Sequence, residues 1–423
     1  MKIFRMLVMI SGIVWLGSGL AKAAVELESN PVKIVMKAES VVDMRPFAKS
    51  EWGFWQFPVI AHLSDGNVYA TFSNHRDAAV MNHVLGPVFK YDLDKNQWAP
   101  EATVMADELS AVELPNGEGF MNQRKAGPDA SKIQLPKQFS VATNWHENRH
   151  YDAREIARLQ PNWWFFKRRA KGDTGKDAWK DETCTVTIRG ESRCVREGML
   201  MYPFFQQILL APSRKGENPA LYAVNMDRRF TDADSKELQP YNPALVFESL
   251  DNGHSWTNVG EIAYQPDQAA DPQWKQKMGF CEPWLGFAPD GSMLCFLRST
   301  FTTPGPLYLA HSLDRGRTWS KPEVFDNHGA KPKVITLKNG ITVATYGRPG
   351  INIALTRDPA AKRWDKPIVI IPASKDFMND TCGYAHLCPL GDNEFMLIYS
   401  DFRRKNAAGE RCKAIVTKRF VVE

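Results

Sequence analysis

Short apolar strands joined by tight turns recur along most of the chain. The clearest examples place Asp-Gly or Asn-Gly between two apolar segments, which is the strongest short-range signal for a β-hairpin. They occupy residues 59–72 (VIAHLSDGNVYATF), 284–297 (WLGFAPDGSMLCFL) and 333–346 (KVITLKNGITVATY), and 388–402 is a looser variant. Hairpins at this spacing predict an all-β protein built from blades of roughly 50–65 residues.

A second pattern, Ser-x-Asp-x-Gly-x-x-Trp, occurs at 249–256 and again at 312–319, and degenerate copies end at Trp98 and Trp364. In such a turn the Asp accepts hydrogen bonds from turn amides, the Gly adopts a positive φ, and the Trp packs back beneath the turn. A repeat of this length indicates a repeated blade. We therefore predict that residues 24–423 form one β-propeller of six blades, or of seven if the middle of the chain holds a regular one.

Residues 120–200 interrupt this pattern. They contain few alternating strands, one helix-like segment (DAREIARLQ), and a segment in which aromatic residues lie beside four bases (NWWFFKRRAKG). We predict an irregular insertion between blades, and long insertions of this kind often shape a binding face. The aromatic and basic segment can form a wall for an acidic sugar, or it can anchor the insertion to the propeller.

The first 23 residues have the pattern of an export signal. Lys2 and Arg5 precede the apolar segment 6–17, and Ala21-Lys22-Ala23 supplies a small-x-small cleavage site, with cleavage expected before Ala24. No later apolar segment approaches the length of a membrane span. The sequence therefore predicts a periplasmic or secreted protein without a membrane span.

The charge balance adds little about binding partners. The formal net charge is +5, and the first 23 residues hold three bases and no acid, which leaves 5 − 3 = +2 for the rest. A nearly neutral protein carries no general signature of nucleic-acid binding. We therefore expect no nucleic-acid partner, and we expect the protein to be a monomer.

Seven cysteines in an exported chain permit disulfides. Cys184 and Cys194 lie ten residues apart around a strand–turn–strand pattern, so we predict a disulfide across that hairpin. Cys382, His386 and Cys388 fall on a single strand, where buried strand residues are a better interpretation than metal ligands. The sequence thus predicts no metal site and no cofactor, although a structural ion in a central channel stays open.

These features together resemble the sialidase superfamily of Asp-box propellers, most closely over residues 240–402. In that family a Glu is followed about sixteen residues later, across an Asp-Gly hairpin, by an Arg, and Glu282 and Arg298 have this spacing. Arg348, in YGRPG, resembles a further Arg that binds the substrate carboxylate. Tyr384, in TCGYAHL, stands at the place of the nucleophilic Tyr. The resemblance implies a carbohydrate-active enzyme with an oligo- or polysaccharide substrate.

The chain departs from the family pattern in the first blade. Gln56 begins the phrase Gln-Phe-Pro where the family has Arg-Ile-Pro, so the first Arg of the substrate-binding triad is absent. Gln56 can hydrogen-bond a carboxylate but carries no charge. Asp77 is the candidate for the family's acid/base Asp. His75, beside it, is a further catalytic candidate, and Arg76 is a further candidate for binding substrate. The departure indicates an acidic glycan other than a sialic acid.

Three functions follow from these residues. The first is an exo-acting glycosidase in which Tyr384 and Glu282 form the nucleophilic pair, while Arg298 and Arg348 bind an acidic group. The second is a uronate-polysaccharide lyase that uses His, Tyr and Arg. Its candidate histidines are His62, His75, His83, His146 and His150. The third is a non-catalytic glycan-binding propeller, because a fold alone does not confer activity.

Overall fold

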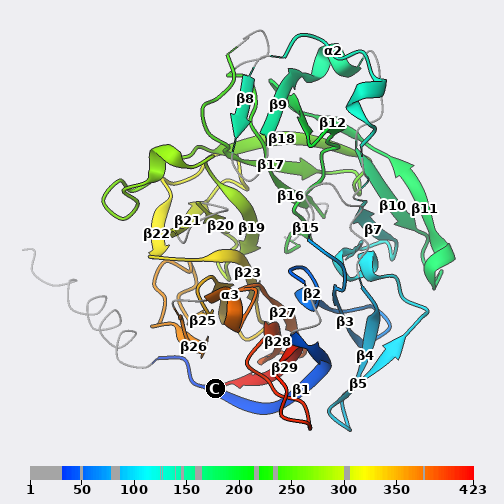
Figure 1. The fold of residues 1–423 in the computed structure, drawn as a ribbon, viewed down its shortest axis with the longest axis vertical. Helices are drawn as coiled ribbons and strands as arrows, with labels where there is room; N and C mark the ends of the chain where they lie inside the picture. Colours follow the sequence, from blue (N-terminus) through cyan, green and yellow to red (C-terminus); the bar gives the residue numbers. More distant parts are fainter. Residues whose placement is uncertain are drawn as a thin grey trace, which may run out of the picture.

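The structure, a computed structural model, contains seven β-sheets, of which six surround a common centre as blades (Figure 1). It describes residues 31–47, 51–77, 86–123, 125, 127–138, 140–143, 147–157, 164–213, 219–231, 237–299, 305–374 and 377–423. The predicted export signal therefore lies outside the described residues. The all-β, six-bladed propeller predicted from the hairpin pattern is confirmed.

Each blade has four antiparallel strands, and in blades 1 to 5 these follow one another along the chain from the centre outward. Blade 1 contains β2 (Gln56–His62), β3 (Val68–Ser73), β4 (Val88–Asp92) and β5 (Gln97–Glu101). Blade 2 contains β6 (Val112–Glu113), β7 (Gly119–Asn122), β10 (Phe165–Arg169) and β11 (Trp179–Thr183). Blade 3 contains β15 (Gln207–Leu210), β16 (Leu221–Met226), β17 (Ala244–Ser249) and β18 (Ser255–Ile262), with β12 (Thr185–Thr187) parallel to β18.

The second half of the chain forms the more regular blades. Blade 4 contains β19 (Cys281–Phe287), β20 (Met293–Arg298), β21 (Leu307–Ser312) and β22 (Glu323–Asp326). Blade 5 contains β23 (Ala330–Thr336), β24 (Thr342–Gly347), β25 (Ile351–Thr356) and β26 (Ile368–Ile371). Blade 6 contains β27 (Ala385–Pro389), β28 (Glu394–Asp401), β29 (Cys412–Val422) and β1 (Ile34–Pro46).

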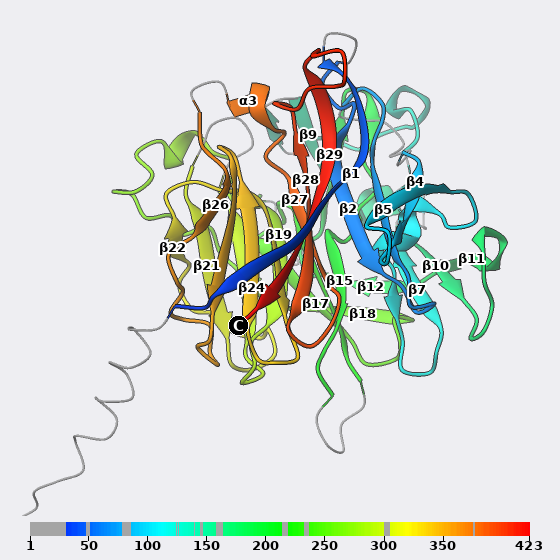
Figure 2. The same cartoon turned by 90° about the horizontal axis from the view of Figure 1, so that it is seen from below.

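The two ends of the described chain close the ring together. Strand β1 pairs antiparallel with β29 from Ile34 opposite Val422 to Pro46 opposite Cys412, and the two strands lie side by side in Figure 2. The N-terminal strand is thus the outermost strand of the last blade. This pairing satisfies the edge of β29, which would otherwise present unpaired backbone groups to solvent.

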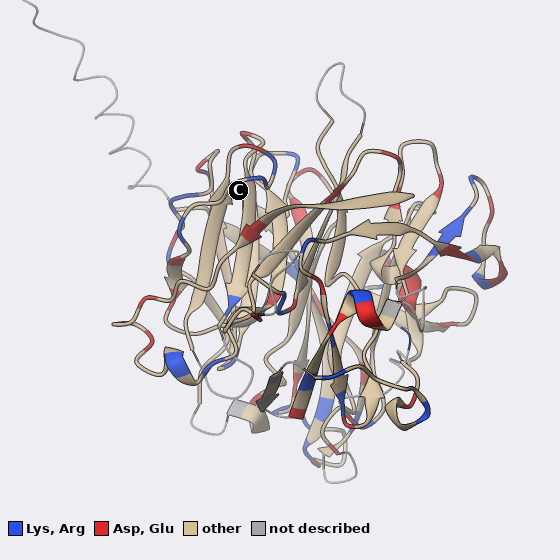
Figure 3. Ribbon diagram, turned by 90° about the horizontal axis from the view of Figure 1, so that it is seen from above, with Lys and Arg blue, Asp and Glu red and all other residues tan. Residues whose placement is uncertain are grey.

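Buried apolar side chains fill the spaces between neighbouring blades. Because side chains alternate along a strand, each blade presents apolar residues to the blade on either side. Blades 5 and 6, for example, meet through Val343, Ile353, Leu387 and Leu397. In Figure 3 the charged positions gather mainly in the loops and at the strand ends, while the long strands are largely uncharged.

The Asp-box turns and their degenerate copies lie between the third and fourth strands of blades 1, 3, 4 and 5. Asp251 and Asp314 each accept a backbone hydrogen bond from the residue four positions later, at 2.9 and 2.8 Å. In both boxes the Trp indole donates to the carbonyl of the box glycine at 2.9 Å. The degenerate third copy has the same bond, from Trp364 to Ala361, and Ala361 takes a positive φ of 50° without being glycine.

The irregular region around 120–200 contributes a seventh sheet. That sheet is assembled from β8 (Ser140–Thr143), β9 (Glu147–Asp152), β13 (Ser192–Arg196) and β14 (Met199–Leu200). Strands β8 and β9 lie between two strands of blade 2 in the sequence, and β13 and β14 lie between blade 2 and blade 3. The same region also supplies the blade strands β10 and β11, so it is only partly an insertion.

The helical segments are short. They are α2 (Ala153–Ala157), α3 (Phe377–Asp380), η2 (Ala106–Ser110), η3 (Ala130–Lys132), η4 (Lys176–Ala178) and η5 (Trp274–Gln276). Among the described residues no helix has the length and apolar character needed to cross a membrane.

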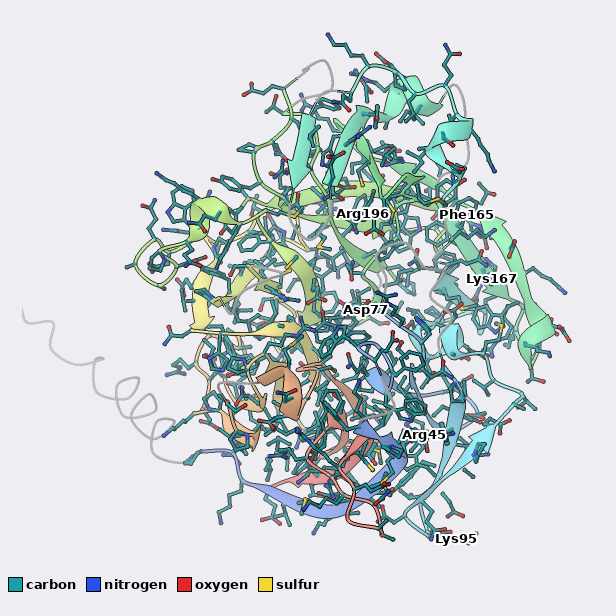
Figure 4. The ribbon with its side chains drawn as sticks, in the orientation of Figure 1. Arg45, Asp77, Lys95, Phe165, Lys167 and Arg196 are labelled. Carbon is teal, nitrogen blue, oxygen red and sulfur yellow. The ribbon has the colours of Figure 1, made fainter. Side chains whose placement is uncertain are left out.

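The described part of the aromatic and basic segment, residues 164–172, is structural and is not among the residues that line the central cavity. It folds as β10, where Phe166 is fully buried against Phe120. Arg168 pairs with Glu182 at 2.6 Å and Arg169 pairs with Glu108 at 3.1 Å. Phe165 and Lys167 of the same strand lie toward the periphery in Figure 4. Of the two interpretations of this segment, the structure favours anchoring.

The predicted disulfide between Cys184 and Cys194 is wrong, since both cysteines are free thiols. The residues between them do not form a hairpin. Strand β12 pairs with β18 of blade 3, whereas β13 pairs with β9 of the seventh sheet. The chain thus passes from one sheet to another between the two cysteines: Cys184 directly precedes β12, whereas Cys194 lies on β13.

Candidate active site

A cavity of about 380 Å³ lies at the centre of the ring. It is lined by residues at the ends of the inner strands and by the loops next to them, and Asp77 of its lining lies near the middle of the molecule in Figure 4. The inner strands of neighbouring blades contact one another around it, as β19 and β27 each do with β23. A propeller therefore brings residues that are far apart in sequence to one place.

Five cavity residues occupy equivalent positions in five blades, namely Phe57, Phe205, Glu282, Lys331 and Tyr384. In each of these blades a backbone hydrogen bond connects the two strands of the first hairpin next to its turn. The cavity residue lies six positions before the residue whose N–H donates that hydrogen bond. Those residues are Leu63, Ala211, Ala288, Leu337 and Leu390. One position of the blade repeat thus supplies a ring of side chains around the cavity.

A backbone bulge aims three members of this ring. Phe57, Glu282 and Lys331 have positive φ values of 54°, 46° and 46°, and each precedes a proline. The register with the next strand shifts at the same point in all three blades. A positive φ is costly for residues other than glycine and is found where surrounding structure enforces it, often at functional sites. The bulge re-aims the side chain toward the cavity.

Glu282, Arg298 and Tyr384 form one hydrogen-bonded group. Nη1 of Arg298 donates to Oε2 of Glu282 at 2.6 Å and to the hydroxyl of Tyr384 at 3.2 Å. The Tyr384 hydroxyl donates in turn to Oε1 of Glu282. Nζ of Lys331 lies 3.8 Å from that same carboxylate oxygen. Three blades thus meet at one carboxylate.

The electrostatics fix the protonation of this group. Burial by itself would raise the pKa of Glu282, but the charges of Arg298 and Lys331 and the Tyr384 hydrogen bond outweigh it and hold the pKa well below its usual value. Burial and the neighbouring Glu282 carboxylate raise the pKa of Tyr384 above its usual value of 10. The resting site therefore holds an ionised Glu282 next to a protonated Tyr384.

Arg348 lies against the other face of this group. Its guanidinium carbon is 4.6 Å from the centroid of the Tyr384 ring, and its Nε donates to the Cys382 carbonyl at 2.8 Å. Gly383 has a positive φ of 72°, and a side chain there would approach Cγ of Arg348 to 2.3 Å. The glycine between Cys382 and Tyr384 therefore makes room for Arg348.

Aromatic residues and a carboxylate form the blade 1 side of the cavity. The Phe57 ring packs 5.1 Å from the Tyr384 ring, centroid to centroid. The Trp52 indole donates to Oδ2 of Asp77 at 3.1 Å, and Nδ1 of His75 lies 2.9 Å from the carbonyl oxygen of Arg76. Both Asp77 and His75 line the cavity.

Two residues expected to bind substrate do not line the cavity. Gln56 is fully buried, because the positive φ at Phe57 turns Phe57, and not Gln56, toward the cavity. The Arg76 side chain is 77% exposed and pairs with Glu51 at 3.9 Å. The expected roles of Gln56 and Arg76 are therefore corrected.

The other candidate histidines that the structure describes, His62 and His150, do not line the cavity with His75. His62 is exposed at the end of β2, and His150 is buried in the seventh sheet. His83 and His146 lie outside the described residues.

Sequence analysis missed several cavity residues, above all Lys331, Lys333, Trp284 and His386. A signal for the first of them was present. Phe57-Pro58, Glu282-Pro283 and Lys331-Pro332 each place the residue before proline eight positions ahead of the Asp or Asn of a turn, at Asp65, Asp290 and Asn339. Comparing the blades at this offset would have added Lys331 to the site.

The described residues contain no group of three or more His, Cys, Asp or Glu side chains arranged to hold a metal ion.

Comparisons with known proteins bear on the fold. No protein-family model matches the chain, and no curated protein matches its sequence. Among solved structures, a Dyadobacter fermentans protein of unknown function matches with a TM-score of 0.59 at 16% identity, over 92% of this chain and 99% of that one. A Penicillium chrysogenum alpha-L-arabinanase, solved with arabinobiose, matches with a TM-score of 0.50 at 13% identity, over 91% and 98%. A Hadza microbial sialidase matches with a TM-score of 0.46 at 13% identity, over 85% and 65%.

Proposed function

We propose that this Asp-box propeller, which shares its fold with a protein of unknown function and with an arabinanase, is a glycoside hydrolase acting on an acidic glycan. One observation carries the proposal: the hydroxyl of Tyr384 donates to an ionised Glu282 that Arg298 holds in place, within the central cavity. A tyrosine whose hydroxyl is hydrogen-bonded to a carboxylate is an activated nucleophile. Glycosidases that do not use the two-carboxylate mechanism use a nucleophile of this kind.

In the first step the Tyr384 oxygen bonds to the anomeric carbon of the substrate. The bond from that carbon to the leaving-group oxygen breaks, and the tyrosine proton passes to Glu282. Asp77 is the carboxyl we assign to protonate the leaving group, because it lines the cavity from the loop after β3. A general acid of this kind contributes roughly a hundredfold or more to the rate.

In the second step water attacks the same carbon, and its proton goes to Asp77. The bond from carbon to the Tyr384 oxygen breaks, and the tyrosine regains its proton from Glu282. Two displacements at one carbon retain its configuration. A neutral hydroxyl suits a substrate whose acidic group lies close to the reacting carbon, because an anionic nucleophile would be repelled.

Arg298 acts in this scheme as a positioning residue. Its side chain is only 3% exposed, and its Nη1 donates hydrogen bonds to Glu282 and Tyr384. Its charge keeps Glu282 ionised, so that the carboxylate is ready to accept the tyrosine proton. Arg298 was expected to bind a substrate anion. We assign this role instead to cations that are more accessible from the cavity.

Two groups of this scheme have shifted pKa values, and each sets a limit on the pH dependence of kcat/KM. Glu282 must be ionised, and its lowered pKa means that activity is lost on this account only well below pH 4.5. Tyr384 must be protonated, and its raised pKa delays any loss until above pH 10. We expect the titration of Glu282 and Tyr384 to cause no fall in kcat/KM between about pH 5 and 10. Lys331→Met, which removes a charge that lowers the pKa of Glu282, should move the acid limb to higher pH.

A panel of acidic polysaccharides and oligosaccharides tests the proposed function. We expect new reducing ends without the ultraviolet absorbance of an unsaturated product, and we expect Glu282→Gln to lose most of this activity. Glu394→Gln is a matched control, since Glu394 pairs with Arg419 on blade 6 outside the cavity lining. Ultraviolet absorbance would identify a lyase, and binding without cleavage would identify a glycan-binding protein; either outcome contradicts the proposal.

A further inference from the structure

Three of the four Lys and Arg residues that line the cavity come from one blade, and the fourth, Arg298 of blade 4, is paired with Glu282. Lys331 and Lys333 lie on β23, and Arg348 follows β24, so all three belong to blade 5. The cavity residues of blade 1 include Trp52, Phe57, Pro58 and Val59, which are apolar apart from the Trp52 indole N–H. Blade 1 also contributes Ser73, His75 and Asp77. The cavity is therefore asymmetric, with a cationic side on blade 5 and a side on blade 1 that is aromatic and carries one carboxylate.

Two of these cations flank the proposed nucleophile. The Arg348 guanidinium carbon lies 4.6 Å and the Lys331 ammonium 5.8 Å from the centroid of the Tyr384 ring. Within the described residues the Arg348 side chain makes one hydrogen bond, from Nε to the Cys382 carbonyl, so its two terminal NH₂ groups remain available. The Lys331 side chain is 21% exposed, compared with 8% for Glu282 beside it.

A second layer lies two residues further along the same strands. There the ammonium of Lys333 sits over the Trp284 ring, 2.9 Å from its centroid, and Trp284 meets His386 edge-on. Burial, together with the charge of Lys333, lowers the pKa of His386 well below its usual value, so the histidine is neutral. The second layer thus adds positive charge on the blade 5 side and no negative charge.

A buried positive potential of this kind is stabilised by an anion, and Lys and Arg donate charge-assisted hydrogen bonds to carboxylate and sulfate oxygens. Resting on the proposed function, we propose that Lys331 determines substrate specificity: together with Arg348 it binds the anionic substituent of the sugar, a carboxylate or a sulfate ester. Lys333 reinforces the potential from beneath. The sugar ring then turns its anionic group toward blade 5 and its apolar face toward Phe57 and Trp52.

This arrangement accounts for the missing arginine of blade 1. Gln56 is buried, and the position beside it that faces the cavity holds the apolar Phe57. The equivalent position of blade 5 holds Lys331, on the same type of bulge before a proline. Blades 1 and 5 thus have the same backbone geometry at this position, but the positively charged side chain is on blade 5 and not on blade 1.

Direct binding tests the proposal without requiring turnover. Isothermal titration calorimetry would compare glucuronate, galacturonate, N-acetylneuraminate and glucose 6-sulfate with glucose and galactose. We expect at least one anionic sugar to bind more tightly than the neutral sugars, and Lys331→Met to weaken that binding about tenfold or more. Lys331→Arg should retain it. A carboxylate-selective or a sulfate-selective response would distinguish the two anionic groups.

Lys338→Met is the matched control, because Lys338 lies in the exposed turn between β23 and β24 with a side chain 82% exposed. Tyr384→Phe should bind the anionic sugar as the wild type does, which separates the two proposals. An active Tyr384→Phe variant would overturn the nucleophile but not the role of Lys331. Unchanged affinity in Lys331→Met, equal affinity for neutral sugars, or no binding of any anionic sugar would overturn the role of Lys331.

Discussion

Replacing Tyr384 with phenylalanine is expected to lower kcat/KM at least about a hundredfold, which corresponds to a loss of about 2.7 kcal/mol of transition-state stabilisation. The substitution removes only the hydroxyl that would bond to the anomeric carbon. The ring would keep its packing against Phe57 and beneath Arg348. Steady-state kinetics on the glycan identified by the substrate panel would measure the loss, and circular dichroism would check that the fold survives.

Tyr346→Phe is the control for this experiment. Tyr346 is also buried, and its hydroxyl donates to Asp326 at 2.6 Å, but it lies on β24 away from the cavity lining. We expect this variant to lose some stability and to keep its activity. Should Tyr384→Phe retain full activity, Tyr384 would be a structural residue, and His75 and Asp77 would be the next candidates for the chemistry.

Replacing Trp256 with alanine is expected to destabilise the protein by about 3–5 kcal/mol, the usual cost of removing a large buried aromatic side chain. Trp256 is 1% exposed and packs against Phe205 and Phe120 within one buried apolar cluster. It also donates to the carbonyl of Gly253, which closes the Asp-box turn. Urea unfolding would measure the change as a lower midpoint.

Trp319→Ala is the matched variant in the next blade. Trp319 makes the same hydrogen bond, to Gly316 at 2.9 Å, but it is only partly buried. We expect a smaller loss of stability than at Trp256, because less apolar surface is removed from the core. Equal losses at both positions would mean that the hydrogen bond within the turn, and not the packing, sets the stability of the blades.

The sequence alone determined the class of fold, because its signals are local. An Asp-Gly or Asn-Gly turn between apolar strands specifies a hairpin, and Asp251 and Asp314 stabilise their turns through neighbours within four residues. Six repeats of such a unit can close only by surrounding a centre. The spacing from Glu282 to Arg298 was readable for the same reason, since Cys281 pairs with Arg298 across a single hairpin.

Only the tertiary structure decided what shares the cavity. The side-chain direction of Gln56 and Phe57 depends on a bulge that positive φ imposes. The proline spacing marks the equivalent position in three blades, but it does not tell which of the two side chains faces the cavity. Likewise, the sequence from Cys184 to Cys194 has the pattern of a hairpin, but in the structure β12 and β13 pair with strands of different sheets. Lys331 approaches Glu282 and Tyr384 because blades 4, 5 and 6 meet at the centre, a contact made between residues 49 and 53 positions apart. Such contacts depend on how whole blades pack against one another, so they can be identified only in the tertiary structure.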